Sequence, residues 1–312
     1  MTMDNGVPVA LVDRAGAVDD DGGAPARWKV VGPGLVVAAT GVGAADMVAT
    51  LVAGSRYGYG LLWAVILGVI LKIVLVEGAG RYTLATGKTI FEGWQTLGRW
   101  TTWYFGPYIM IWGFVYGATA MSSTALPLAA LFPVFSLTVW AVIMGLLGFV
   151  MVWFGRYAFF EKLTAVLVGL MFVSVVGLAA IAAPNLPDML KGLAPIIPDG
   201  GVVYTLALAG GVGGTITLAA YGYWLREKGW YTPKWMRVMR IDNSAAYVLT
   251  GIFVVAMLIV GAEVVRAAGV SLSAGDKGLV DLSGVLRDKY GDLVGIGFLV
   301  GFWAASFSSI IG

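Results

Sequence analysis

The 312-residue chain contains no cysteine and no histidine, and these two absences narrow the chemistry open to it. Without cysteine there is no disulfide framework and no thiolate metal site. Without histidine, the commonest metal ligand and the usual proton shuttle are missing. Ion binding must therefore use carboxylates, hydroxyls, carbonyls or methionine. We expect no cofactor and no enzyme activity, because no acid–base pair or activated nucleophile is visible.

Charge is also scarce: 12% of the residues are charged, 59% are hydrophobic, and the mean hydropathy is +0.86. Such values lie far from those of soluble domains and predict an all-α integral membrane protein. The net charge of +2 gives no indication of nucleic acid, so the lipid bilayer is the expected partner. About eight segments are long and apolar enough to cross it, namely 31–55, 59–80, 104–131, 135–154, 163–183, 202–225, 244–265 and 293–312.

The basic residues are unevenly distributed between the two sides of these spans. If the N-terminus is cytoplasmic, the inner segments hold more than twice as many Lys and Arg residues as the outer loops. The positive-inside rule therefore predicts a cytoplasmic N-terminus, in the plasma membrane of a bacterium-like cell. Residues 1–26, which contain VDDDGGAP, are too acidic for a signal peptide and predict a disordered cytoplasmic tail. Residues 27–312 would form the transmembrane domain.

Two predicted spans contain glycine-rich stretches, TGVGAAD at 40–46 and GGVGGT at 210–215. Glycine costs about 1 kcal/mol relative to alanine inside a helix, so the first and sixth spans are expected to unwind. These two spans are equivalent in transporters built from inverted five-helix repeats, where broken helices hold the substrate near the membrane midplane. For either stretch alone, close helix packing through small residues is the alternative explanation.

Several segments resemble, in their order and spacing, the Nramp family of divalent-metal transporters. The matching pieces are GPGLVVAATGVGAADMVATLVAGSRYGYGLLW at 32–63, RYTLATGK at 81–88, RYAFFEKL at 156–163, LKGLAPIIP at 190–198, RVMRID at 237–242 and AASFSSIIG at 304–312. The resemblance implies a LeuT-type inverted-repeat transporter fold with broken first and sixth helices. Because family members have at least ten core helices, we expect the second repeat to be truncated in this chain.

The site residues usual in this family are largely replaced. Its first-helix signature Asp-Pro-Gly-Asn lines up with Gly-Ala-Ala-Asp at 43–46, which moves the carboxylate to Asp46. Its sixth-helix Met-Pro-His lines up with Thr-Leu-Ala at 217–219, and the third helix lacks the acidic residues that the family uses in proton movement. The resemblance therefore implies the fold without the usual site chemistry.

Asp46 is the expected charged ligand of a cation site. A carboxylate at the bilayer centre costs at least about 2.5 kcal/mol, so it should face a wet cavity or a partner. A structural carboxylate bonded to its own helix is the alternative. Carbonyl or hydroxyl oxygen would come from the two glycine-rich stretches and the residues beside them, specifically Thr40, Gly43, Gly213, Thr215 and Thr217. An all-oxygen site favours a hard cation such as Mg²⁺ or Mn²⁺.

Two charged residues of the second span, Lys72 and Glu77, are candidates for coupling transport to another ion. Glu77 lies four residues before Arg81, and this spacing favours a structural ion pair on one helix. Lys72 either extends toward the membrane interface or reaches the site and pairs with Asp46. In the second case a fixed ammonium would take the role of a bound cation and disfavour a metal.

The sequence thus predicts a secondary transporter that moves divalent metal ions by alternating access, with proton coupling left open. One alternative is an organic-solute transporter of the same fold, in which Asp46 binds an amine. Another is a receptor or scaffold that retains the fold and transports nothing. Saturable uptake would separate transport from a scaffold, and competition between divalent ions and amino acids would separate the two kinds of transporter.

Overall fold

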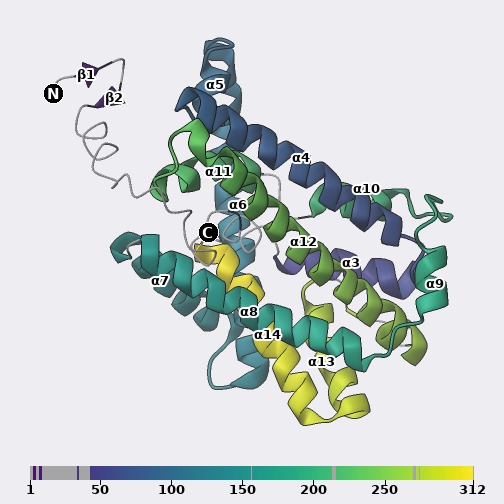
Figure 1. The fold of residues 1–312 in the computed structure, drawn as a ribbon. Coiled ribbons are helices and arrows are strands. Elements are labelled where there is room, and N and C mark those ends of the chain that lie inside the picture. Colours follow the sequence, from purple (N-terminus) through teal and green to yellow (C-terminus); the bar gives the residue numbers. More distant parts are fainter. Residues whose placement is uncertain are drawn as a thin grey trace, which may run out of the picture. The chain divides into compact units, whose positions relative to one another are not determined.

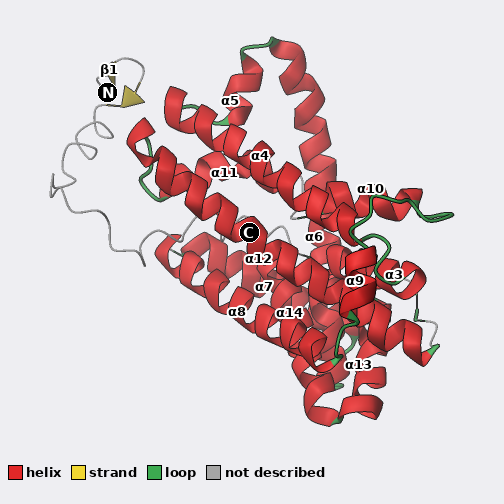
Figure 2. Ribbon diagram, turned by 45° about the vertical axis from the view of Figure 1, so that its right-hand side comes forward, coloured by secondary structure: helices red, strands yellow, loops and turns green. Residues whose placement is uncertain are grey.

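The computed structural model is almost entirely helical (Figures 1 and 2). It describes residues 3–4, 7–8, 34, 43–155, 157–212, 216–269, 272–273 and 275–311. The chain divides into two units, residues 1–30 and 31–312. In the first unit, β1 (Met3–Asp4) pairs antiparallel with β2 (Val7–Pro8). The rest of the predicted tail lies outside the described residues.

The second unit consists of helices. In chain order they are α3 (Ala44–Tyr57), α4 (Leu62–Thr86), α5 (Ile90–Gln95), α6 (Arg99–Leu131), α7 (Leu137–Phe154), α8 (Tyr157–Ile181), α9 (Leu186–Lys191), α10 (Val202–Gly211), α11 (Ile216–Glu227), the 3₁₀ turn η2 (Pro233–Trp235), α12 (Met236–Val260), the π-helix η3 (Gly261–Arg266), α13 (Lys277–Tyr290) and α14 (Asp292–Ile311). Six helical segments of the described chain are long and apolar enough to span a membrane. The protein is therefore an all-α integral membrane protein, as predicted.

Each predicted span contains at least one described helix, but several helix ends were predicted wrongly. The second span ends at Thr86 in α4, beyond the predicted end at 80. The seventh begins at Met236, before the predicted start at 244. The segment between the predicted spans 244–265 and 293–312 contains α13. Hydropathy detects the apolar part of a helix, whereas backbone hydrogen bonding continues the helix into the polar interface.

The sixth span is broken, as its glycine-rich stretch predicted. α10 ends at Gly211, Val212 leaves the helical conformation (φ −48°, ψ 114°), and α11 starts at Ile216. In the first span, α3 begins after Gly43, whose backbone is extended (φ −109°, ψ −179°). Gly34 is helical, and residues 35–42 between them lie outside the described part.

The core of the second unit surrounds α3, which packs on α12, η3, α10 and α14. α14 in turn packs along α6 and α8, and Figure 1 shows its yellow ribbon beside α8. Buried side chains such as Met47, Leu51 and Met257 fill this core. Large apolar side chains on α6 and α7 are exposed instead, with Phe114 at 81% and Phe154 at 77%. These two helices therefore present apolar surface suited to lipid.

α3 crosses the junction of α12 and η3 at two glycines. A Cβ added to Gly54 would overlap the carbonyl oxygen of Leu258, and one added to Gly261 would overlap the carbonyl oxygen of Leu51. Because neither glycine has a side chain, the two backbones approach closely, as small residues allow in membrane helix packing. This crossing fixes the position of the helix that carries Asp46.

Candidate substrate site at the two helix breaks

Asp46 lies in the first turn of α3, three residues after Gly43, whose backbone is extended. Its Oδ2 accepts a hydrogen bond from the Gly43 amide at 3.3 Å, and the amides of Asp46 and Met47 each donate to the Gly43 carbonyl at 3.2 Å. The carboxylate therefore accepts a hydrogen bond from the start of its own helix. A carboxylate has about four acceptor positions, so this one contact leaves capacity for a ligand.

Three other helices bring groups toward Asp46. At the end of α10, a Cβ on Gly211 would lie 3.5 Å from Oδ1 of Asp46. On α6, the hydroxyl of Tyr116 is within hydrogen-bonding reach of Ser309 on α14 and interacts electrostatically with Asp46. A Cβ on Gly43 would lie 3.2 Å from Oγ of Ser309. The two helix breaks and two hydroxyls thus converge on one carboxylate.

Lys72 approaches the same place from α4. It lies near the middle of that helix, is only 4% exposed, and its ammonium interacts electrostatically with Asp46. One turn earlier, a Cβ on Gly68 would lie 2.8 Å from the carbonyl oxygen of Leu208 and 2.9 Å from that of Ala209, in the last turns of α10. The structure therefore buries Lys72 in the protein interior rather than at the membrane interface, and its contact with Asp46 stays a prediction.

The broken helices contribute charge of their own at this point. The last carbonyls of an α-helix have no partner within the helix and carry a partial negative charge. Those of α10 end at Gly211, next to Asp46. The carboxylate and this helix end together form a negative region that suits a cation.

Glu77 is engaged elsewhere on α4. Its Oε1 accepts from Arg81 at 2.5 Å, which confirms the ion pair predicted from the spacing of these two residues. The same oxygen also accepts from Nε of Arg240 on α12 at 2.7 Å. Glu77 therefore joins α4 to α12 through two arginines, a structural contact.

Other predicted contributors remain predictions. Thr40, Gly213 and Thr215 lie outside the described residues, and only the backbone of Thr217, in α11, is described. Among the described residues no three Asp, Glu, His or Cys side chains cluster as metal ligands. Within that part of the chain, Asp46 is the acidic side chain that we assign to the site.

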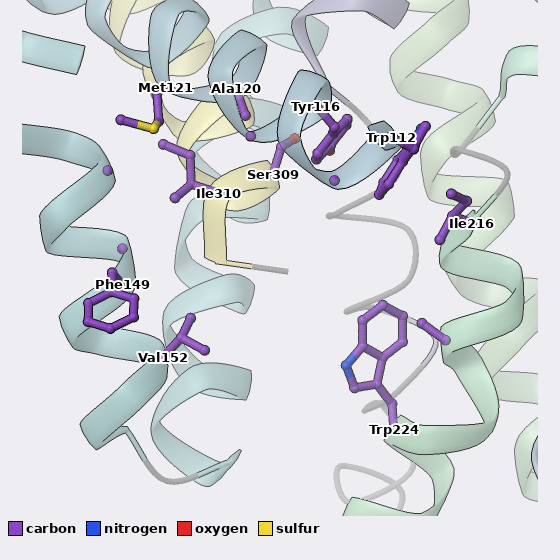
Figure 3. A pocket seen from close by; sticks show the side chains of 15 residues that line it. Trp112, Tyr116, Ala120, Met121, Phe149, Val152, Ile216, Trp224, Ser309 and Ile310 are labelled. Atoms are coloured by element: carbon purple, nitrogen blue, oxygen red, sulfur yellow. The ribbon is translucent and has the colours of Figure 1, made fainter. Parts of the chain in front are cut away.

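A cavity of about 450 Å³ lies beside this group (Figure 3). Its lining residues come from α6, α7, α11 and α14, and they are Trp112, Gly113, Tyr116, Gly117, Ala120, Met121, Gly145, Gly148, Phe149, Val152, Ile216, Ala220, Trp224, Ser309 and Ile310. Tyr116 stacks on Trp112, with ring centroids 4.6 Å apart. The lining contains two hydroxyl groups, those of Tyr116 and Ser309. The cavity therefore leads along aromatic walls to the hydroxyls beside Asp46.

The sequence did not predict a second buried carboxylate, Asp242 of α12. It is 2% exposed, and its Oδ2 accepts from the amide of Gly34 at 2.5 Å and from the hydroxyl of Tyr221 on α11 at 3.4 Å. The predicted seventh span begins at 244, which leaves Asp242 in a loop, where a charge needs no partner. The signal that could have found it is the helical continuity of the stretch from Met236, which turns Asp242 into a charge inside a span.

The far end of α11 is fixed by Arg226. Its Nη2 donates to Oε2 of Glu92 at 2.8 Å and also to the carbonyl of Gly87. Glu92 accepts from the Thr89 amide at 2.5 Å, which caps α5. Partial burial raises the pKa of Glu92, but the hydrogen bonds from Thr89 and the Arg226 charge outweigh it and hold that pKa below its usual range. The second half of the sixth span is therefore anchored to the end of α4.

Comparison with known proteins identifies one family. The family described as natural resistance-associated macrophage protein-like (Nramp) matches residues 34–312. Two relatives bear the name divalent metal cation transporter MntH. That of Chromohalobacter salexigens is 27% identical over 266 residues, covering 79% of this chain and 60% of that protein. That of Mycobacterium leprae is 25% identical over 305 residues, covering 90% and 67%. The chain thus spans about three fifths to two thirds of the length of these relatives.

Crystal structures of the Eremococcus coleocola manganese transporter share the fold. One mutant matches with a TM-score of 0.75 at 18% identity, covering 92% of this chain and 64% of that one. A second mutant has the same score and identity and covers 94% and 66%. At this identity the likeness establishes the fold, and it confirms the LeuT-type inverted-repeat arrangement.

Proposed function

Since the chain belongs to the Nramp family, we propose that it acts as a secondary transporter that moves divalent metal cations across the membrane by alternating access. Two relatives named divalent metal cation transporter support this proposal. We further propose that the N-terminus is cytoplasmic, in line with the distribution of basic residues.

The position of Asp46 carries the proposal. Its carboxylate lies between Gly43, at the start of α3, and Gly211, at the end of α10, so it adjoins both helix breaks. A cation bound there would meet this carboxylate, the terminal carbonyls of α10, and the hydroxyls of Tyr116 and Ser309. Broken helices near the midplane bind the substrate in transporters of this architecture.

We propose that the site prefers a hard cation such as Mn²⁺ or Mg²⁺. Carboxylate, carbonyl and hydroxyl oxygens suit such ions, and the chain has neither cysteine nor histidine to offer softer ligands. With one carboxylate, the ion would keep part of its water shell, as Mg²⁺ does readily. Thr40, Thr215, Thr217 and the backbone of Gly213 are proposed as further oxygen donors.

Proton coupling forms no part of the proposal. The chain has no histidine to act as a shuttle. Glu77, one of the two residues considered for coupling, is held by Arg81 and Arg240. The other, Lys72, is buried, and its charge interacts with that of Asp46.

Uptake into proteoliposomes tests the proposal. We expect saturable uptake of Mn²⁺ or Mg²⁺ by the wild type, and at least a tenfold lower kcat/KM in Asp46→Asn, which removes the charge and preserves the shape. Asp199→Asn, in an exposed loop, is the matched control and should transport normally. Gel filtration of each variant establishes that it is folded.

Two results would contradict the proposal. One is a folded wild-type protein that takes up no divalent ion. The other is an Asp46→Asn variant that transports at the wild-type rate. Uptake of amino acids by the wild type, unaffected by Mn²⁺, would point instead to an organic-solute transporter.

A further inference from the structure

We infer that Lys72 is a tethered cation of the substrate site, whose ammonium competes with the transported divalent ion for Asp46 and the end of α10. Lys72 thereby sets how tightly the site holds its substrate. This inference rests on the proposed role of Asp46 as a cation ligand.

The packing of α4 on α10 directs Lys72 to this position. Residues four apart lie on the same face of a helix, so Lys72 shares the face on which Gly68 touches the carbonyls of Leu208 and Ala209. Lys72 lies one turn farther along α4, toward the break at which α10 ends.

Asp46 reaches the same break from the other side. Its Oδ1 would lie 3.5 Å from a Cβ on Gly211, the last residue of α10, and its charge interacts with that of Lys72. The carboxylate and the helix end therefore adjoin, and the charge of Lys72 acts on the same carboxylate from α4.

Because Lys72 is buried, the charges around it strongly affect its stability. A charge removed from water needs compensating partners, and Lys72 is 4% exposed. The carboxylate of Asp46 supplies part of that compensation, and the end of α10 carries partial negative charge next to Asp46. A divalent ion needs the same two groups, and it would meet the like charge of Lys72 inside the protein, where the low dielectric strengthens repulsion.

Competition of this kind suits a carrier. A transported ion must bind well enough to enter a site and weakly enough to leave it. With Lys72 in place, the site keeps a counter-charge for Asp46 after the metal departs, so the empty carrier does not leave this carboxylate without a counter-charge. Lys72 thus lowers the affinity of the site for the metal ion and raises the rate of turnover.

The test measures Mn²⁺ binding to the purified full chain by isothermal titration calorimetry. We expect Lys72→Met, which keeps the length and apolar stem of the side chain, to lower the Kd at least tenfold, or about 1.4 kcal/mol. Turnover in uptake should fall at the same time, because release becomes slower. Lys72→Gln is a second variant that keeps a polar end and should show the same change.

Two controls accompany these variants. Lys191→Met removes an exposed lysine of α9 and should leave the Kd unchanged. The double variant Asp46→Asn with Lys72→Met should lose the gain in affinity, because the competition is for the carboxylate of Asp46.

The outcomes separate this inference from the proposed function. If Asp46→Asn abolishes Mn²⁺ binding but both Lys72 variants bind as the wild type does, or more weakly, the inference is overturned and the proposed function stands. If the Lys72 variants bind Mn²⁺ and the wild type does not, the inference holds and metal transport by the wild type is contradicted. Binding by none of the folded proteins overturns both.

Discussion

At the scale of single residues, Asp46 and Asp242 show two ways of placing a carboxylate inside a membrane protein. Asp46 is only partly buried, accepts from the amide of Gly43, and faces the charge of Lys72. Asp242 is buried and accepts from a backbone amide and a tyrosine hydroxyl. The first arrangement leaves room for a ligand, whereas the second joins Gly34 to α11 and α12 and contributes to stability.

We predict that Asp242→Ala lowers the free energy of unfolding by about 2 kcal/mol or more, because it leaves the buried amide of Gly34 without this acceptor. Thermal unfolding in detergent, followed by tryptophan fluorescence, measures the change. Asp199→Ala, on an exposed loop, is the control and should stay within about 0.5 kcal/mol of the wild type. Equal losses in the two variants would contradict a structural role for Asp242.

At the scale of elements, close packing between helices positions the site. α3 is short and carries Asp46 at its start, so its placement depends on the crossing of Gly54 with Gly261 of η3. α4 contributes to the site at two positions. Gly68 has no side chain and so allows α10 to approach, and Lys72 brings a positive charge that interacts with Asp46. Glycine therefore has two separate uses here, as a helix breaker at the two breaks and as a packing surface elsewhere.

The close crossing of α3 and η3 can be tested by adding a methyl group at Gly54. Gly54→Ala places a methyl group against the carbonyl oxygen of Leu258, so we expect destabilisation of about 1–3 kcal/mol from overpacking, together with weaker Mn²⁺ uptake. Gly78→Ala in α4 is the matched control, because its Cβ meets no atom within 4 Å. That change should be neutral or stabilising, since alanine favours a helix. Unfolding temperatures compare the two, and an unchanged value for Gly54→Ala would contradict the close crossing.

At the scale of the whole molecule, the long helices match the thickness of the bilayer, and their ends define its two sides. α4 contains 25 residues, so it is about 37 Å long and spans the hydrocarbon region. α9 lies near the start of α4, since the amide of Trp63 donates to the carbonyl of Gly192 at 3.0 Å. Lys88 follows the other end of α4. Lys88 and Lys191 should therefore lie on opposite sides of the membrane.

The absence of cysteine allows this topology to be tested directly. We predict that a membrane-impermeant maleimide labels Lys191→Cys in intact cells, because this position faces outward when the N-terminus is cytoplasmic. Lys88→Cys should be labelled only after the membrane is opened. Both positions are exposed in the structure, so each variant controls for the reactivity of the other. The reverse pattern would contradict the proposed orientation.

The membrane class, the positions of most spans and the break in the sixth span could be predicted from the sequence alone. Each depends on properties that act over short stretches of chain. Apolar composition decides which segments enter lipid, and glycine weakens a helix wherever it accumulates. The ion pair of Glu77 with Arg81 was predictable for the same reason, since residues four apart on a helix always lie close together.

The ends of the helices and the partners of the site residues were decided by the tertiary structure. Nothing local distinguishes Ser309 from its neighbours in AASFSSIIG, and it approaches Gly43 and Tyr116 only because α14 packs beside α3 and α6. From the sequence, the side chain of Lys72 could extend to the membrane interface or into the protein interior. Because α4 packs against α10, it is buried in the interior. The burial of Asp242 likewise depends on Tyr221 of another helix. Contacts between residues far apart in the chain depend on how helices pack, which local composition and periodicity do not encode.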